Sequence, residues 1–292
     1  MAIDTWIDGA VDNIYASYAW SNGTPQAGDL PVFGTGTAFL GGGNLNGTTL
    51  TLSGIDAATQ PTLIAYGASS ISVLVSQQEH PNPGPGSAAW GTVEVIGAPQ
   101  VSMEVLGGKG SNEFGTVNID GWSQMRGGFT ETGDNASVVI NGAGTSTFAN
   151  DASSVGYNDV AQINAAVVGT GTFNVSSFGA LLLNAGVSAG QTINDQGLVT
   201  IGDTRDFHGS IDWSPPPVGG DFISLAGLTA DSSTYQNGVL SLFAGGNDVF
   251  DLHLQVAGGG TVAATQTAGG VQVYASATAA MAANAVVLAA HA

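Results

Sequence analysis

The chain has no cysteine, few bases and little charge of any kind. Lys and Arg together occur three times in 292 residues, and charged residues make up only 9%; about 25% is usual. The absence of cysteine excludes disulfides and cysteine-ligated metal sites. Lys109, Arg126 and Arg205 cannot form the basic cluster that binds phosphates, so nucleic acid and anionic membrane surfaces are excluded as partners.

Long apolar runs are missing as well. No stretch of about 18 apolar residues occurs, so we expect no membrane insertion. The start of the chain, Met1–Trp6, has neither the basic nor the apolar region of a cleaved signal peptide. A cysteine-free chain with a net charge of −19 and 45 glycines is nevertheless typical of exported bacterial proteins. We therefore expect a secreted or cell-surface protein without a cleaved N-terminal signal.

Short alternating runs dominate what remains. Apolar and polar residues alternate in segments bounded by Gly, Asn and Asp, and helical periodicity is nearly absent before residue 275. This period-2 pattern, rich in β-branched residues, predicts β-strands. A hydrophobic content of 43% and a mean hydropathy of +0.22 argue against disorder. The clearest runs cover residues 48–52, 70–75, 92–96, 101–106, 116–120 and 137–141.

One phrase recurs along the chain. Gly34–Phe39, Gly142–Phe148 and Gly169–Phe173 each place a Gly-rich corner before a Thr-flanked Phe. Glycine supplies the positive φ that such a corner needs, and Thr and Phe then begin the next strand. Self-similarity without helices predicts a solenoid. The predicted fold is all-β, a right-handed parallel β-helix with Val, Ile, Leu and Phe inside; a β-sandwich, or a pair of them, is the alternative.

The ends and interruptions of the pattern suggest a division of the chain. Prolines make residues 77–90 a protruding loop and residues 213–220 a stiff link, since proline lacks the donor that a sheet needs. Trp6, Tyr15, Tyr18 and Trp20 could plug an open coil end, and the tail is Ala-rich without Asp, Glu, Lys or Arg. The predicted parts are an N-terminal cap or assembly segment (1–30), a β-solenoid (31–212), a C-terminal β module (213–275) and an Ala-rich tail (276–292). We interpret the tail as an export signal, a terminal cap or a frayed end.

Residues from about 184 to 276 resemble a module of large secreted proteobacterial proteins. The resemblance is to autotransporter-like and hemolysin-type calcium-binding-related β-helical proteins, and residues 20–29 likewise resemble the entry to Gly/Asn-rich surface solenoids. It implies an architecture and a secreted location, in proteins that are typically adhesins, matrix proteins, fibres or surface coats. The matching phrases are residues 187–193, 202–211, 220–228, 238–242 and 250–254.

Calcium is the only cofactor that the sequence suggests. Residues 245–252 look like one fragment of the Gly/Asp nonapeptide that binds Ca²⁺ between coils of β-rolls. The fragment occurs once, and an ordinary Asn-Asp turn is the alternative. The candidate metal ligands are Asp203, Asp206, Asp248 and Asp251.

No constellation of catalytic residues emerges. A lyase would need Arg126 or Arg205 beside acids, and a hydrolase would need two facing carboxylates, whereas the aspartate pairs are explained by turns. The four histidines are scattered, and no G-x-S-x-G elbow is present. We therefore expect a protein that is not an enzyme. Trp90, Trp122 and Trp213 are candidates either for a sugar-stacking platform or for the core.

These observations favour a secreted bacterial structural protein that assembles with copies of itself into an extracellular fibre, surface layer or biofilm matrix. Head-to-tail contact between two different solenoid ends does not close, so it produces filaments. The expected partners are the chain itself and cell-surface polysaccharide. The alternatives are a carbohydrate-binding adhesin module and a β-helical polysaccharide-degrading enzyme.

Overall fold

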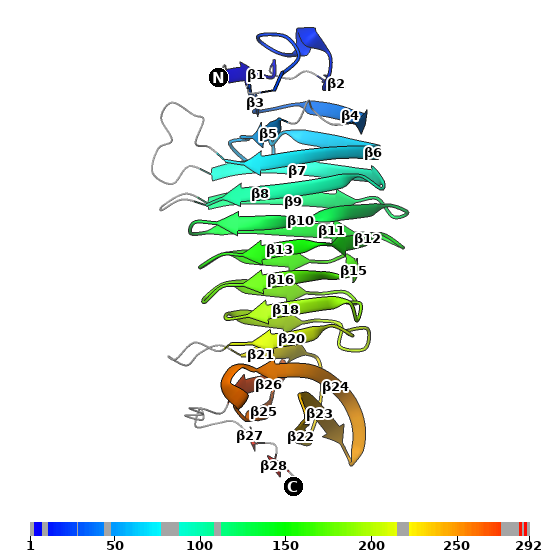
Figure 1. Ribbon diagram of the computed structural model, residues 1–292, viewed down its shortest axis with the longest axis vertical. Coiled ribbons are helices and arrows are strands. Elements are labelled where there is room, and N and C mark those ends of the chain that lie inside the picture. The colour runs from blue at the N-terminus through cyan, green and yellow to red at the C-terminus, as the bar shows by residue number, and fades with distance from the viewer. Residues whose placement is uncertain are drawn as a thin grey trace.

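The computed structural model is an elongated stack of β-strands with the chain ends at opposite poles (Figure 1). Successive strands lie side by side along the long axis, so the fold is an all-β solenoid, as predicted. Two short 3₁₀ segments, Ser17–Ala19 (η1) and Ala257–Gly259 (η2), interrupt it. The structure describes residues 3–7, 11–27, 29–43, 48–76, 88–107, 112–214, 222–275, 286–287 and 289–290.

Two parallel sheets form the walls of the solenoid, and the chain alternates between them. Strand β6 (Thr62–Val75) runs through both, because Thr62–Gly67 pairs in the second sheet and Ser70–Val75 in the first. The first sheet also contains β1 (Ile3–Thr5), β3 (Leu30–Phe33), β5 (Thr49–Leu52), β8 (Gln100–Leu106), β10 (Gln124–Thr132), β12 (Thr147–Asn150), β13 (Ala152–Val155), β15 (Ala166–Val168), β16 (Gly171–Val175), β18 (Gln191–Asp195) and β20 (Ser210–Trp213).

The second sheet follows the same course on the other wall. Its strands pair in parallel from one coil to the next, and this pairing rules out the antiparallel sandwich for this part of the chain. The members are β2 (Val11–Asn13), β4 (Thr37–Gly43), β7 (Ala88–Gly97), β9 (Asn112–Ile119), β11 (Ala136–Gly142), β14 (Val160–Ile163), β17 (Ala180–Leu183), β19 (Leu198–Ile201) and β21 (Ile223–Ala226).

Antiparallel strands follow the last parallel coil. Strand β24 continues the first sheet by pairing in parallel with β20, and β26 adds antiparallel to β21 in the second. A three-stranded antiparallel meander, β22–β23–β24, and a hairpin, β25–β26, extend these edges. We call this part the antiparallel module: β22 (Ser232–Gln236), β23 (Val239–Ala244), β24 (Asn247–Val256), β25 (Val262–Thr267), β26 (Gly270–Ala275), β27 (Val286–Val287) and β28 (Ala289–Ala290).

The coils become shorter between β6 and β20. Ser70 pairs with Gln100, 30 residues on, whereas Thr192 pairs with Ser210, only 18 residues on. Parallel pairing also continues to β21, so the stack extends beyond residue 212. Strand β7 begins at Ala88, so the last three residues of the predicted loop 77–90 belong to a strand. The rest of that loop, residues 77–87, and residues 215–220 of the predicted proline link lie outside the described residues.

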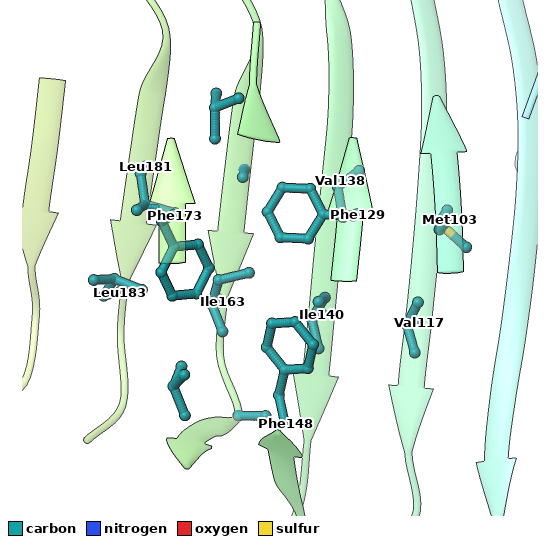
Figure 2. Packing of buried hydrophobic residues seen from close by; sticks show 14 of the residues in the cluster. Met103, Val117, Phe129, Val138, Ile140, Phe148, Ile163, Phe173, Leu181 and Leu183 are labelled. Atoms are coloured by element: carbon teal, nitrogen blue, oxygen red, sulfur yellow. The ribbon is translucent and has the colours of Figure 1, made fainter. Parts of the chain in front are cut away.

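Alternation along each strand builds the core. In β10 every second side chain is buried, and stacked coils align these positions into inward columns. One column contains Met103, Phe129 and Phe173. Figure 2 shows the rings of Phe129 and Phe173 packed between the two sheets with Ile163 and Leu181 of the opposite wall. Burial of this kind is the main stabilising term.

Glycine corners behave as the repeated phrase predicts. Gly36, Gly144 and Gly169 all have positive φ, at 98°, 63° and 80°. The strands β4, β12 and β16 then begin with, or close before, the Thr and Phe of each phrase. The first sheet also bends at Gly127 and Gly128. Strand β10 runs through this bend, whereas the next coil is divided opposite it into β12 and β13.

Outward amides form a ladder across four coils of the second sheet. Asn118, Asn141, Asn164 and Asn184 each donate from Nδ2 to the residue one coil earlier, at 2.7–3.0 Å, and Glu94 accepts the first bond. Stacked amides of this kind satisfy both donor and acceptor without any charge. They show how a chain with so few charged residues supplies its outer surface with polar contacts.

Candidate functional site

The predicted metal ligands Asp203 and Asp206 lie in the turn between β19 and β20. Asp203 Oδ1 accepts a hydrogen bond from the Arg205 backbone amide at 3.2 Å, which is the geometry of an Asx turn. Within the described part of the chain, no group of three or more His, Cys, Asp or Glu residues is arranged to hold a metal. Calcium binding by this pair stays a prediction.

Asp248 and Asp251 belong to the antiparallel module. Gly245 and Gly246, with φ of 59° and 81°, form the turn between β23 and β24, as expected for a two-residue hairpin loop. Asp248 Oδ1 accepts from the Phe250 amide, and Asp251 Oδ1 accepts from Ser241 Oγ across the hairpin. The nonapeptide-like fragment is therefore a β-hairpin, and local hydrogen bonds engage both carboxylates.

The three candidate tryptophans lie in different environments. Trp213 is 1% exposed, so of its two predicted places the structure supports the core. Trp90 stacks on Phe114 of the next coil, with ring centroids 4.1 Å apart. Trp122 is 89% exposed in the turn before β10. Only Trp122 presents a largely open ring.

Two carboxyl groups that the sequence analysis did not single out are buried together. Glu131 of β10 lies in an inward column between Val105 and Val155 of the neighbouring coils and is 1% exposed. Neither of its carboxylate oxygens makes a hydrogen bond of ordinary geometry within the described residues, although the Val138 backbone amide still favours the ionised form. Such a group is costly unless something neutralises it.

Asp159 comes from the next coil and lies at the corner where the chain passes from β13 to β14. It is fully buried, and its Oδ1 accepts a hydrogen bond from the Ala136 amide of the coil before at 2.8 Å. Its Oδ2 has no partner within the described residues. A Cβ on Gly156 would lie 2.2 Å from this Oδ2 and 2.8 Å from the Glu131 carbonyl oxygen, so glycine is needed here.

The electrostatics of the pair follow from its burial. Burial, reinforced by the charge of Asp159, raises the pKa of Glu131 to about 9, and the Val138 amide opposes the shift. Burial also raises the pKa of Asp159 to about 6, against the hydrogen bond from Ala136 and together with the charge of Asp134. Glu131 therefore holds a proton at neutral pH. Because the pair is enclosed, it can bind a proton or an ion but cannot contact a polymeric substrate.

An aromatic pair lies outside the same corner. The rings of Tyr157 and Phe178 meet edge-to-face with centroids 5.2 Å apart, and the residues are 50% and 64% exposed. Phe178 has φ of 62°, the left-handed region that Asn135 and Asn158 occupy at the equivalent positions of the two preceding coils. Asn adopts this conformation more readily than Phe, so Phe178 occupies it at a cost in backbone strain.

Searches against protein-family models, curated proteins and solved structures found no match. The resemblance of residues 184–276 to secreted β-helical proteins therefore stays a prediction. No helix in the described residues is long and apolar enough to cross a membrane.

Proposed function

We propose that this protein is a secreted or cell-surface structural protein of a bacterium, which assembles with copies of itself into a fibre, surface layer or biofilm matrix. The proposal assigns no catalytic activity to the chain. It includes a right-handed coil, the sense that parallel crossover connections favour, and an N-terminal segment that ends the stack as a cap or assembly surface.

The main support for this proposal is the structure of the N-terminal end of the stack. Within the described residues, β2 pairs with β4 on one side and with no strand on the other. The outer edge of β1 is covered by residues 19–21 through backbone bonds such as Ile7 to Ala19. Ile3, Ile7 and Tyr18 are exposed at this end by 52%, 49% and 71%. An open strand edge beside exposed apolar side chains is a template for pairing with another chain.

Two of the predicted plugging aromatics lie beneath this surface. Trp6 and Trp20 are buried and meet edge-to-face at 5.0 Å, and Trp6 also contacts Phe33. Trp20 Nε1 donates to the Ile14 carbonyl at 2.8 Å. The first coil is thus a packed platform, which favours contact through a preformed surface rather than through an unfolded segment.

The opposite end differs. Its sheet edges continue into the antiparallel module, where β27 pairs with β25 and β28 with β22. Two unlike ends favour a heterologous contact. We therefore place the association-competent edge at the N-terminal coil.

Sedimentation velocity over a concentration series tests the proposal. The double variant Ile3→Lys/Ile7→Lys is expected to remain monomeric at concentrations where the wild-type chain associates. Ile55→Lys/Ile96→Lys is the matched control, because these residues are 63% and 46% exposed on other coils. A wild-type chain that stays monomeric throughout, or equal loss of association in both variants, would contradict the proposal.

The aromatic corner favours a second candidate, binding of a polysaccharide. Exposed rings stack on sugar faces, and Phe178 keeps its ring exposed against a backbone preference. Phe178→Asn removes the ring but suits the local φ, so it should fold at least as well as the wild type while losing glycan binding. Glycan-array signals should persist in Trp122→Ser. Binding that is unchanged in Phe178→Asn would exclude this corner.

A further inference from the structure

The corner between β13 and β14 gathers acidic side-chain oxygens with few hydrogen-bond donors around them. Both side-chain oxygens of Glu131 and Oδ2 of Asp159 make no hydrogen bond of ordinary geometry within the described residues, and the Val138 amide compensates the Glu131 carboxylate only in part. The Glu131 carbonyl oxygen and Asp159 Oδ2 also flank the same point beside Gly156. All of these atoms are acceptors when the acids are ionised, and they come from two adjacent coils.

The described residues supply no basic side chain to balance them. Of the three Lys and Arg residues of the chain, Arg126 and Arg205 are described and Lys109 lies outside the described residues. Arg126 points elsewhere in the described structure, with Nε donating to Gln124 Oε1. No salt bridge to Glu131 or Asp159 is present in the described part of the chain, and Asp134 adds further negative charge nearby. With no base of the described residues beside them, the two acids are left to protons or to an ion taken up from solution.

We propose that Glu131 and Asp159 are the side-chain ligands of a divalent cation site between two adjacent coils, with Ca²⁺ as the preferred ion. Ca²⁺ binds carboxylate and backbone carbonyl oxygens in irregular geometry, which suits this mixture better than the strict octahedron of Mg²⁺. Two carboxylates are below the usual ligand count, so the Glu131 carbonyl oxygen and water complete the shell. The site is independent of the four aspartates that the sequence singled out.

Ion binding here competes with protonation. A buried carboxyl group must be ionised before it can ligate a metal ion. The proposal therefore predicts that Ca²⁺ uptake releases a proton and strengthens as the pH rises from about 6 to about 8. Because the ion binds the folded chain only, it also raises the melting temperature.

Calorimetric titration of the chelator-treated full chain with CaCl₂ at about pH 8 is the decisive experiment, with MgCl₂ as the comparison ion. We expect saturable binding of a single ion whose heat depends on the ionisation enthalpy of the buffer, and a melting temperature that rises with Ca²⁺. Glu131→Gln and Asp159→Asn keep the side-chain shape, and the amide oxygen introduced by the second substitution can still accept from the Ala136 amide. Each should weaken Ca²⁺ binding by more than about tenfold.

Two further double variants serve as controls, Asp203→Asn/Asp206→Asn and Asp248→Asn/Asp251→Asn, and both should bind as the wild type does. Circular dichroism confirms that each variant is folded. The proposal is overturned if the wild type shows neither saturable heat nor a shift in melting temperature, because protons alone then neutralise the pair. It is also overturned if Ca²⁺ stabilises the Glu131→Gln variant as much as the wild type.

Discussion

Glu131 makes the stability of this fold depend on pH in an unusual direction. Its pKa is raised from an ordinary 4.5 to about 9, first by burial and then by the charge of Asp159. Between these two values the folded chain binds a proton that the unfolded chain does not bind. The free energy of unfolding therefore falls as the pH rises through this window, and it is unaffected by this group below the unfolded pKa.

The size of this destabilisation follows from the difference between the folded and unfolded pKa values of Glu131. Each pH unit above the unfolded pKa costs about 1.4 kcal/mol, so Glu131 alone costs about 3 kcal/mol at pH 7 and about 6 kcal/mol at pH 9. Asp159 contributes with the same sign between its ordinary pKa of 3.8 and its raised value of about 6. A loss of this size is large against the roughly 5–15 kcal/mol that is usual for a folded domain.

Glu131→Gln removes the ionisation and keeps the shape. We expect the variant and the wild type to unfold at similar temperatures near about pH 4, and the variant to be more stable by several kcal/mol at about pH 8. Thermal unfolding followed by circular dichroism across this pH range, with chelator present, measures the difference. Glu104→Gln is the control, because Glu104 is exposed on the adjacent strand β8. Parallel stability–pH curves for the wild type and Glu131→Gln would refute the argument.

Two further predictions concern the stack itself. Asn141→Ala removes an inner rung of the amide ladder and should lower the free energy of unfolding by about 1–2 kcal/mol, measured by urea unfolding; Asn184→Ala, at the exposed end, should cost less, and equal losses would argue against a ladder. Gly128→Ala places a Cβ 1.7 Å from the Ala152 carbonyl oxygen and should cost about 1–3 kcal/mol. Gly34→Ala, with no atom within 4 Å, should leave the melting temperature nearly unchanged.

The solenoid was predictable because two local signals agree along the chain. Alternation fixes which side chains of a strand such as β10 face inward, and Gly36, Gly144 and Gly169 mark corners that only a positive φ can make. Together they define strands and bends without any long-range information. The strand register could not be predicted in the same way. The coils vary in length from 18 to 30 residues, so the sequence alone does not show which residue of the next coil pairs with a given residue.

The position of Glu131 was also present in the sequence. Counting in steps of two from Met125 through Phe129 reaches Glu131, so the alternation that predicts the core also places this acid inside it. The same count from Ile193 reaches Asp195, which is likewise buried and accepts a hydrogen bond from the Gly197 amide. The signal was missed because charged residues were sought as surface ligands rather than as members of the inward columns.

Asp159 and Phe178 carried no such signal. Asp159 follows an Asn in an ordinary turn sequence, and only the stacking of one coil on another brings its carboxylate to the Ala136 amide and beside Glu131. Phe178 adopts a conformation that its residue type disfavours, which no propensity predicts. Both depend on the stacking of neighbouring coils, at corners where the period-2 rule does not apply.

The scarcity of basic residues links the surface to the interior of this protein. With three bases in the chain, Glu131 and Asp159 have no lysine or arginine partner among the described residues, although such residues are the usual partners of buried acids. Backbone amides satisfy part of the need, as at Asp159 and Asp195. What remains at Glu131 must be met by a proton or a cation from the medium, so the composition that excludes nucleic acid as a partner also couples the stability of the fold to its ionic surroundings.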